Sequence, residues 1–257
     1  MNDSLNSTNK LLSLMPGSDF ALLLPHLEPA SLACGEYIYG LGERSGFVYF
    51  PETAVITHLY FLKDGSTSAA TVIGNDGMIG LSAIFNSAAP SCATQTTIGG
   101  TALRISAEVL KREFARVESL RQVILSYASA RIAHLSQKAV CNVRHKLDER
   151  LCTWLLMVQD RAREQQLRLT HEQIANYLGT RRAGVSSACN GLRKDGIIDY
   201  QRGAIKIVER QLLETAACEC YQAFRQIDQQ SLAPQLSGTV QVGAFGRRAG
   251  NNAAAPG

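Results

Sequence analysis

Residues 169–208 combine residue types and spacings that suit contact with DNA. Within one predicted helix of this stretch, polar side chains recur at steps of four, four and three, at Arg182, Ser186, Asn190 and Arg193. Such spacing places side chains on one face of a helix. The face offers hydrogen-bonding groups and two cations without an acid, which is the chemistry that contacts base edges and phosphates in a DNA groove. We therefore expect a recognition helix here.

Two short helices are predicted to position this face. Thr170 and Gln173 form a capping box at the start of the first helix, because their side chains satisfy each other's backbone donors. Gly179 suits the left-handed residue that ends it. Gly196 ends the second helix, whose apolar face carries Val185, Ala188, Cys189 and Leu192. Two helices joined by so short a turn must cross each other.

A wing is predicted after the second helix. Residues 198–208 are rich in apolar side chains on both sides of Arg202 and Gly203, a pattern typical of two short strands joined by a tight turn. Phosphate contacts are expected at the start of the first helix, in the turn and at the wing tip. The candidates at these places are Thr170, Thr180, Arg181 and Arg202.

Helix, turn, recognition helix and wing in this order resemble the winged helix-turn-helix of the Crp/Fnr family of bacterial transcription regulators. The resemblance extends to HKLDERLCTWLLMVQDR (145–161) and LLETAACECY (212–221), and more weakly over the N-terminal half. It implies a cytoplasmic homodimer that binds a palindromic operator in double-stranded DNA, with RNA polymerase as a further partner. It also aligns Arg182 with the family's guanine-reading arginine. Ala183 and Ser187 stand where the family often has Glu and Arg. We therefore expect an operator that differs from those usual in the family, with Ser187 among the residues that contact it.

The two halves of the chain differ in charge. The 257 residues carry a formal net charge of +4, yet residues 1–120 hold 7 Lys and Arg against 11 Asp and Glu, while residues 121–210 hold 16 against 8. A basic region binds a polyphosphate by releasing its condensed counterions. The excess of cations around the helix-turn-helix therefore favours DNA over an acidic small molecule as its partner.

The N-terminal part has the sequence pattern of a small antiparallel barrel or jelly roll. Short aromatic and β-branched runs alternate with turns, at residues 36–39, 47–50, 54–62, 67–73, 93–98 and 102–105. The clearest hairpin turn is Lys63-Asp64-Gly65-Ser66. The Crp/Fnr resemblance implies that this barrel is similar to cyclic-nucleotide-binding domains. We therefore expect an α+β chain.

The cyclic-nucleotide cassette that the resemblance implies lacks its charged residues. In that cassette a Gly-Glu pair holds the ribose, and an Arg-Ser or Arg-Thr pair holds the cyclic phosphate. Gly80 and Leu81 align with the first pair, and Ser91 and Cys92 align with the second. Leucine cannot accept a hydrogen bond from a ribose hydroxyl, and no guanidinium meets the phosphate. We expect a degenerate sensor that does not use cyclic AMP through the usual pocket.

A long helix is predicted to join the two parts. Apolar residues recur there at steps of three or four over roughly 40 Å. The seam consists of Val117, Leu120, Ile124, Ala128, Ile132, Leu135, Ala139 and Val143. So long a seam suits a parallel two-helix dimer, and helix-turn-helix proteins commonly read two half-sites as dimers. The alternative is a helix packed on its own barrel through part of the same surface.

Two further helices and a tail complete the predicted order. An amphipathic helix with Leu147, Leu151 and Trp154 should brace the helix-turn-helix. A last helix is predicted for residues 211–226, and the remainder has too few large apolar groups to fold. The predicted division is a sensor domain (1–115), a dimerisation helix (116–145), a DNA-binding domain (146–228) and a disordered tail (229–257).

No metal site or redox cofactor is predicted. The seven cysteines are scattered through apolar patterns, which is typical of reduced cytosolic thiols. Only Cys34 precedes residue 92, so the N-terminal cysteine cluster of an iron–sulfur sensor is missing. The histidines, at positions 26, 58, 134, 145 and 171, are not paired at metal spacing. Cys218 and Cys220, two apart on a predicted helix, should point to different faces.

Other classes of protein find little support in the sequence. It has no set of histidines and a carboxylate for a cupin, no nucleophile elbow, no Walker loop and no dinucleotide fingerprint, so we do not expect an enzyme. No segment has the apolar core of a signal peptide or a membrane span. The alternative is a ligand-binding or scaffold protein whose helix-turn-helix contacts another protein. Weak, salt-independent retention on DNA would favour that alternative.

Overall fold

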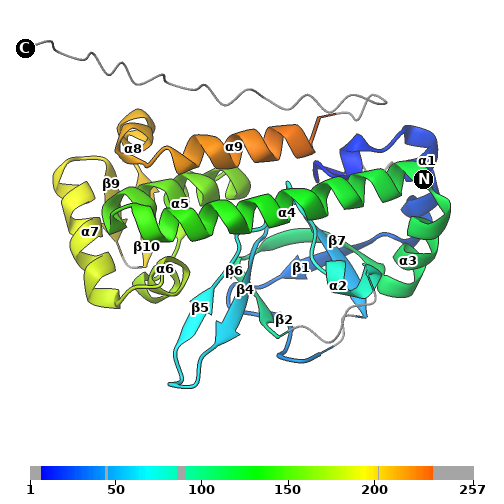
Figure 1. Cartoon of the computed structure of the whole chain (residues 1–257), viewed down its shortest axis with the longest axis horizontal. Coiled ribbons are helices and arrows are strands. Elements are labelled where there is room, and N and C mark those ends of the chain that lie inside the picture. The colour runs from blue at the N-terminus through cyan, green and yellow to red at the C-terminus, as the bar shows by residue number, and fades with distance from the viewer. Residues whose placement is uncertain (1–6, 44–45, 86–90, 202, 234–257) are drawn as a thin grey trace, which may run out of the picture.

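The structure is a computed structural model that describes residues 7–43, 46–85, 91–201 and 203–233. Its N-terminal part is a β-structure, its middle is one long helix, and its C-terminal part is mostly helical (Figure 1). The predicted α+β class is confirmed. Arg202 and most of the predicted tail lie outside the described residues.

The described residues of the N-terminal part form seven antiparallel strands in two sheets. The first sheet has the order β1 (Glu28–Leu32), β7 (Gly100–Ser106) and β3 (Phe47–Pro51). The second has the order β2 (Tyr37–Tyr39), β6 (Ala93–Ile98), β4 (Val55–Phe61) and β5 (Thr67–Ala69). The predicted hairpin turn joins β4 to β5, where the Leu62 N–H donates to the Ser66 carbonyl at 2.9 Å. Strand β1 was not predicted, because its sequence, EPASL, has a proline and little β-branched character.

Short helices cover the ends of this β-structure. Before the strands come η1 (Leu12–Leu14), α1 (Gly17–Leu23) and η2 (Leu24–His26), and between β5 and β6 lies α2 (Leu81–Ile84). The chain then continues into α3 (Ala107–Arg116). Buried residues of these helices pack with those of β3 and β7 in one apolar cluster, which includes Leu23, Phe50, Leu103 and Leu110.

Helix α4 (Glu118–Arg144) has 27 residues and crosses the molecule alongside the β-structure (Figure 1). Its predicted dimer seam divides into two parts with different surroundings. Ile124 is 1% exposed, and Val117, Leu120 and Ile124 all pack in the same core as Phe50 and Leu110. These three residues were therefore wrongly assigned to a dimer surface, because the start of α4 covers its own barrel.

The second part of the seam faces outward. Ile132 is 68% exposed, Leu135 46% and Val143 83%, and Ala139 is exposed as well, while Ala128 is half-buried. Leu125 and Val140, which the prediction left out, are also large exposed apolar residues on this helix. An apolar stripe thus remains on the surface of α4, shorter than predicted and rotated toward Leu125.

The C-terminal part begins with α5 (Leu147–Ala162), after a break at His145 and Lys146. It continues with β8 (Gln166–Arg168), α6 (His171–Leu178), α7 (Arg182–Lys194), β9 (Ile198–Gln201) and β10 (Ala204–Ile207). The strands form one antiparallel sheet in the order β8-β10-β9. Strands β9 and β10 are the predicted wing, and β8 is a third strand that was not predicted.

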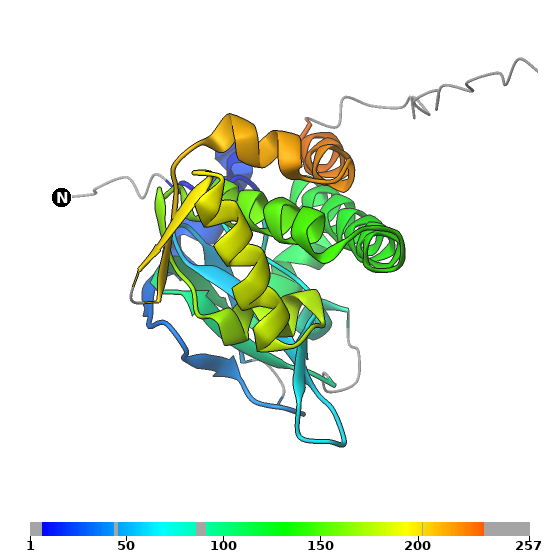
Figure 2. The ribbon, with the colours of Figure 1, turned by 90° about the vertical axis from the view of Figure 1, so that its left-hand side faces the viewer.

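The single helix predicted for residues 211–226 is two helices, α8 (Arg210–Ala216) and α9 (Cys220–Ser231). They are separated because Ala217, with ψ of 152°, has an extended backbone. Helix α9 runs beside α4 (Figures 1 and 2) and continues past residue 228, where the tail was predicted to begin. The C-terminal end of the described chain therefore returns to the middle of the molecule.

The barrel and the C-terminal part share one apolar core. Val55, Leu59 and Val72 of the barrel belong to the same cluster of buried residues as Trp154 of α5 and Phe224 of α9. No helix within the described ranges is both long enough and apolar enough to cross a membrane. The helix-turn-helix is thus packed directly against the barrel, with no extended linker between them.

A buried ionic network crosses this contact. One terminal nitrogen of Arg161, on α5, lies 2.7 Å from Asp76 in the loop after β5 and 3.0 Å from Asp228 on α9. His134 of α4 meets Asp228 at 2.7 Å. Burial lowers the pKa of His134, so its imidazole is neutral at pH 7 and the contact is a hydrogen bond. Three elements that are distant in sequence therefore meet at one guanidinium, and α4 joins them through Asp228.

We expect Arg161→Met to lower the free energy of unfolding by about 3–5 kcal/mol, because it leaves Asp76 and Asp228 without their cation in a buried place. The control is Arg104→Met, which removes the exposed pair of Arg104 with Glu28 and should cost no more than about 1 kcal/mol. Urea unfolding followed by circular dichroism measures both values. Equal losses of unfolding free energy in the two variants would contradict the role of Arg161 as the cation of a buried network.

Candidate nucleic-acid interface

Helix α6 begins and ends as its sequence predicts. The Thr170 hydroxyl accepts from the Gln173 N–H at 3.2 Å, and the Gln173 side chain accepts from the Thr170 N–H at 2.8 Å. This reciprocal pair is the predicted capping box. Gly179 then takes a left-handed conformation with φ of 62°, which a residue with a side chain adopts only with strain. The turn between the helices is therefore set by local sequence.

Helix α7 has the two faces that its sequence predicts. Its apolar face is buried, and consists of Val185, Ala188, Cys189 and Leu192. Its polar face is exposed to solvent at Arg182, Ser187, Asn190 and Arg193. Arg193 lies 3.6 Å from Asp199 of the wing, while Arg182 is at the first turn of the helix. The polar face is thus open to solvent along the length of the helix.

Ser186 departs from this pattern. Its hydroxyl donates to the Arg182 carbonyl at 3.0 Å and lies 2.9 Å from Nδ1 of His171. The His171 ring also stacks on Tyr200 of β9, with centroids 4.4 Å apart. Ser186 therefore faces the neighbouring helix, and His171 joins α6, α7 and the wing. No local pattern indicates this role of His171, because its partners lie 15 and 29 positions away.

The predicted phosphate candidates surround this face unevenly. Thr170 and Arg181 are exposed and Thr180 is half-buried. The third strand adds a cation that was not predicted, because Arg168 of β8 pairs with Ala204 of β10 in the sheet register. Arg168 and Lys206 both lie on the exposed face of the wing sheet. The described wing therefore has two cations away from its tip.

Side chains from α4 and α5 hold α6 in place. Arg150 of α5 donates to the Leu178 carbonyl at the end of α6 and, at 2.8 Å, to Asn142 of α4. Lys138 of α4 donates to the Ala69 carbonyl of β5 at 2.6 Å and lies 3.6 Å from the centre of the Tyr177 ring. Burial lowers the pKa of Lys138 to about 7. The helix-turn-helix is thereby fixed to both the long helix and the barrel.

The cassette residues of the barrel do not form a charged site. Gly80 has φ of 106° and precedes α2, Ser91 is exposed, and Cys92 is buried. Residues 86–90 between the two pairs lie outside the described part. The sequence from Gly74 to Leu103 contains no Lys or Arg. Arg104, the nearest cation along the chain, pairs with Glu28 at 2.9 Å instead.

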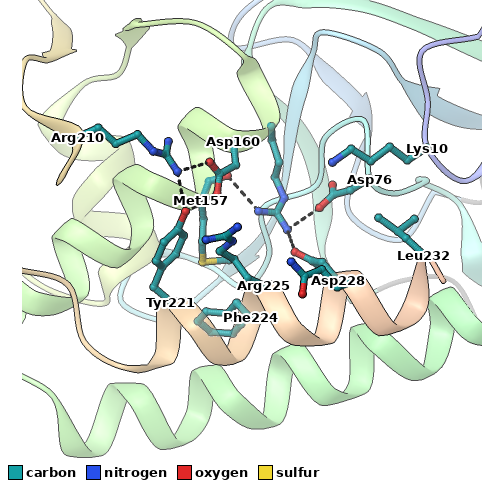
Figure 3. A pocket seen from close by; sticks show the side chains of 12 residues that line it. Lys10, Asp76, Met157, Asp160, Arg210, Tyr221, Phe224, Arg225, Asp228 and Leu232 are labelled. Carbon is teal, nitrogen blue, oxygen red and sulfur yellow. Dashed lines mark hydrogen bonds and ion pairs between the residues drawn. The ribbon is translucent and has the colours of Figure 1, made fainter. Parts of the chain in front are cut away.

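A cleft of about 490 Å³ lies between α5, α9 and the N-terminal segment (Figure 3). Its charged residues mostly contact one another. Arg210 donates to Asp160 and to the Tyr221 hydroxyl at 2.7 Å each, and Lys10 and Arg225 line the same space. Most of the side chains that line the cleft are polar or charged, and Arg161 of the buried network is one of them.

Four residues that were not predicted to meet come together at the other end of α9. They are Cys141, His145, Cys218 and Cys220. Cys218 and Cys220 do not lie on opposite faces of one helix, because Cys218 precedes α9 and Cys220 is its first residue. The spacing of Cys141 and His145, four positions apart at the end of α4, was a metal-ligand signal that the prediction did not use.

Comparisons with known proteins agree with this geometry. A family model described as a Crp-like helix-turn-helix domain matches residues 149–216. No curated protein matches the sequence. FixK2 from Bradyrhizobium japonicum has a similar structure, with 21% sequence identity, a TM-score of 0.64, and coverage of 75% of this chain and 98% of that chain.

Two further solved structures are similar over most of this chain. TTHB099, a CRP-family transcriptional regulator from Thermus thermophilus, has 18% identity and a TM-score of 0.63, and covers 73% of this chain and 96% of its own. CLP, a c-di-GMP responsive global regulator from Xanthomonas campestris, has 16% identity and a TM-score of 0.61, and covers 75% and 99%. At such identities these similarities concern the fold.

Helices α6 and α7 with the β8-β10-β9 sheet thus define a winged helix-turn-helix domain, preceded by a two-sheet barrel and a long helix. Residues 149–216 match the Crp-like helix-turn-helix domain, and the chain has the same fold as solved Crp/Fnr-family transcription regulators.

Proposed function

We propose that this protein is a sequence-specific DNA-binding transcription regulator, which binds a palindromic operator as a homodimer. The observation that carries the proposal is the exposed face of α7, which presents Arg182, Ser187, Asn190 and Arg193 and no acidic residue. A helix enters the major groove of DNA with such a face. The matched Crp-like domain supports the same function.

Arg182 is the residue that we assign to base recognition. It lies in the first turn of α7, and the N-terminal residues of a recognition helix are those that reach the base edges. A guanidinium forms two hydrogen bonds with O6 and N7 of guanine. Asn190 and Ser187, further along the face, are proposed as additional contacts, while Ser186 is proposed to orient His171.

Phosphate contacts are proposed around the base-reading face. Arg181 and Thr180 lie in the turn before α7, and Thr170 begins α6. Arg202 is proposed from the sequence alone, and Arg168 is added because β8 places it on the wing sheet. Such contacts fix the position of a protein on DNA without reading its sequence.

The exposed stripe on α4 is proposed as the dimer surface. Leu125, Ile132, Leu135 and Ala139 repeat at steps of seven, three and four, as apolar residues of a two-helix seam do. Charged residues are absent from these positions, and large apolar groups on a monomer surface commonly mark an interface. A two-fold symmetry axis through this stripe would present the two copies of α7 in a dimer to the two half-sites of an operator.

Cyclic AMP is proposed not to act through the barrel. A cyclic nucleotide brings a negative phosphate that must be met by a cation or by several aimed donors. Arg104 is paired with Glu28, and Arg131 of α4 donates to the Val72 carbonyl at 3.5 Å. The effector is therefore proposed to be different, or absent.

The protein is further proposed to act in the bacterial cytoplasm together with RNA polymerase, as its fold class implies. The alternative function is a scaffold whose helix-turn-helix contacts another protein. The excess of cations in residues 121–210 favours DNA, because a protein contact would not require it. Measured affinity for DNA that falls steeply with salt separates the two functions.

Arg182→Ala is expected to weaken binding to the preferred operator by about 1–3 kcal/mol and to flatten the preference among sequences, because it removes the guanine contact. Arg202→Ala is the control and should weaken all sequences alike. Gel shifts with the operator and single-base variants measure both. If Arg182→Ala kept the affinity and preference of the parent, the assignment would be wrong.

The double variant Ile132→Asp with Leu135→Asp is expected to be monomeric and to lose operator binding, because it places charges in a dry interface. Both side chains are exposed in the single chain, so its fold should survive. The control pair is Leu22→Asp with Leu212→Asp, which are similarly exposed on α1 and α8. Light scattering gives the mass of each variant, and a dimer in the first pair would place the interface elsewhere.

Isothermal titration with cyclic AMP or cyclic GMP at millimolar concentration is expected to give no saturable heat, because Ser91 and Cys92 offer no charge to the phosphate. Addition of either nucleotide should also leave operator affinity unchanged. Saturable binding at micromolar concentration would show that the barrel holds these nucleotides by other residues.

A further inference from the structure

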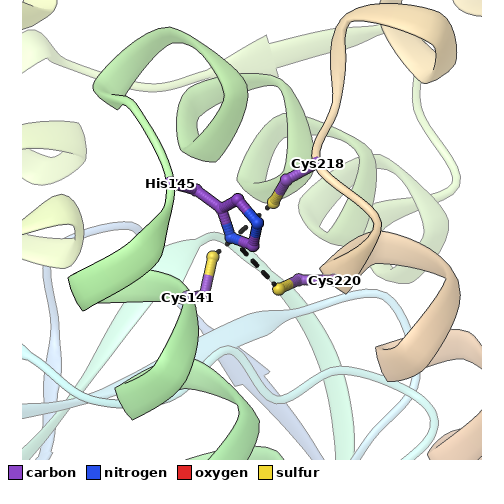
Figure 4. Close-up of side chains that lie close together, drawn as sticks. All are labelled: Cys141, His145, Cys218 and Cys220. Carbon is purple, nitrogen blue, oxygen red and sulfur yellow. Dashed lines mark hydrogen bonds between the residues drawn. The ribbon is translucent and has the colours of Figure 1, made fainter. Parts of the chain in front are cut away.

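Three thiols and one imidazole converge where the long helix ends. Cys141 lies in the last turn of α4 and His145 follows that helix, while Cys218 and Cys220 come from the link between α8 and α9 and from the first residue of α9. One ligand atom of each residue lies within 4.8 Å of the ligand atoms of the other three (Figure 4). The four side chains point toward one another from two segments that are more than 70 positions apart in the sequence.

The distances suit a single metal ion. With bonds of about 2.3 Å to sulfur and about 2.0–2.1 Å to nitrogen, a tetrahedral zinc site places its ligand atoms roughly 3.4–3.8 Å apart. Cys141 Sγ and Cys218 Sγ are 3.6 Å apart, and Cys220 Sγ is 3.4 Å from His145 Nδ1. A [4Fe–4S] cluster would hold its thiolates further apart, because each binds a different iron. A disulfide would bring two sulfurs to about 2.05 Å.

The residues around the four ligands also suit a metal. Nε2 of His145 lies 3.1 Å from a carboxylate oxygen of Glu219. A proton on Nε2 donates to this carboxylate and leaves the lone pair of Nδ1 directed at the thiols, as in many metal-binding histidines. Gln137 donates to Cys220 Sγ at 3.1 Å, and the Thr153 hydroxyl lies 3.1 Å from Cys218 Sγ. These groups can stabilise the negative charge of bound thiolates.

The site is enclosed by protein. All three thiols are buried, and the His145 side chain is largely covered. The other four cysteines, at 34, 92, 152 and 189, do not belong to the group. The cluster is thus a distinct feature of the junction between α4, α5 and α9.

We propose that Cys141, His145, Cys218 and Cys220 bind one zinc ion in a tetrahedral, structural site. Four protein ligands fill the coordination sphere, so no position is open for a substrate or a catalytic water. The mixture of three sulfurs and one nitrogen is a common zinc set and is unsuited to calcium or magnesium, which bind oxygen. Binding requires loss of the thiol protons to solvent, and no oxidation takes place.

The metal would add a link between two parts of the chain that are also joined by packing and by the contacts of Asp228. It links the α4–α5 junction, which leads from the long helix into the helix-turn-helix, to the start of α9, which returns to the barrel. The proposed site does not depend on the proposed function, since zinc can bind here whether or not the protein binds DNA. If the protein does bind DNA, the metal would fix the orientation of α5 beneath α7.

Metal analysis of the reduced, full-length protein purified without chelator tests the proposal. We expect one zinc ion per chain, and cobalt exchanged into the site should show the visible absorption of tetrahedral thiolate-bound Co²⁺. Removal of the metal should lower the unfolding temperature by several degrees. Less than about a tenth of a zinc ion per chain, with no cobalt absorption after incubation of the reduced apoprotein with Co²⁺, would overturn it.

Single variants locate the ion within the chain. Cys141→Ser and Cys220→Ser should each lose the cobalt absorption or shift it markedly, whereas Cys189→Ala, which removes a buried thiol of α7 outside the group, should keep it. If a ligand variant does not fold, the cobalt spectrum of the parent protein still decides. Full cobalt absorption in both serine variants would contradict the proposed zinc site. A Cys141–Cys218 disulfide that resists reduction in the metal-free protein would also contradict it.

Discussion

The arrangement of the molecule depends on the burial of Arg161. Its guanidinium meets Asp76 of the barrel and Asp228 of α9, and Asp228 in turn meets His134 of α4. A buried charge is tolerated only with such partners, so each of these elements is held in one position relative to α5. Gly74 permits this approach, because a Cβ on it would lie 2.6 Å from the Arg161 Cβ. Since α5 carries the helix-turn-helix, the place of the recognition helix follows from this contact.

The long helix α4 serves two surfaces. Its first turns belong to the barrel core through Leu120 and Ile124, and Lys138 near its other end holds both β5 and Tyr177 of α6. Only the outward stripe near Ile132 is left for a partner. A change in the barrel would thus reach the helix-turn-helix through contacts that already exist. The barrel and the helix-turn-helix are thus coupled by packing and not by a flexible linker.

The local parts of this structure could be predicted from the sequence, and the parts that depend on distant contacts could not. The capping box of Thr170, the left-handed Gly179 and the two faces of α7 were all predicted, because the signals lie within a few residues. Ile124 was misplaced, because an apolar stripe does not say whether a barrel or a partner covers it. Cys218 and Cys220 were misplaced because the break at Ala217 lies inside a continuous helical pattern. The meeting of Cys141 with Cys218 depends on the return of α9 to α4, which no local pattern shows.

Base recognition by α7 in a two-fold dimer is the central claim, and selection of DNA from a random pool tests it most directly. Fragments retained by the purified protein would be sequenced after several rounds at physiological salt. We expect enrichment of a two-fold symmetric motif, with half-sites centred about one helical turn, or about 10 base pairs, apart. A guanine should be invariant in each half-site, at the position that Arg182 would read. Retention of fragments without any enriched motif, or no retention at low salt, would contradict it.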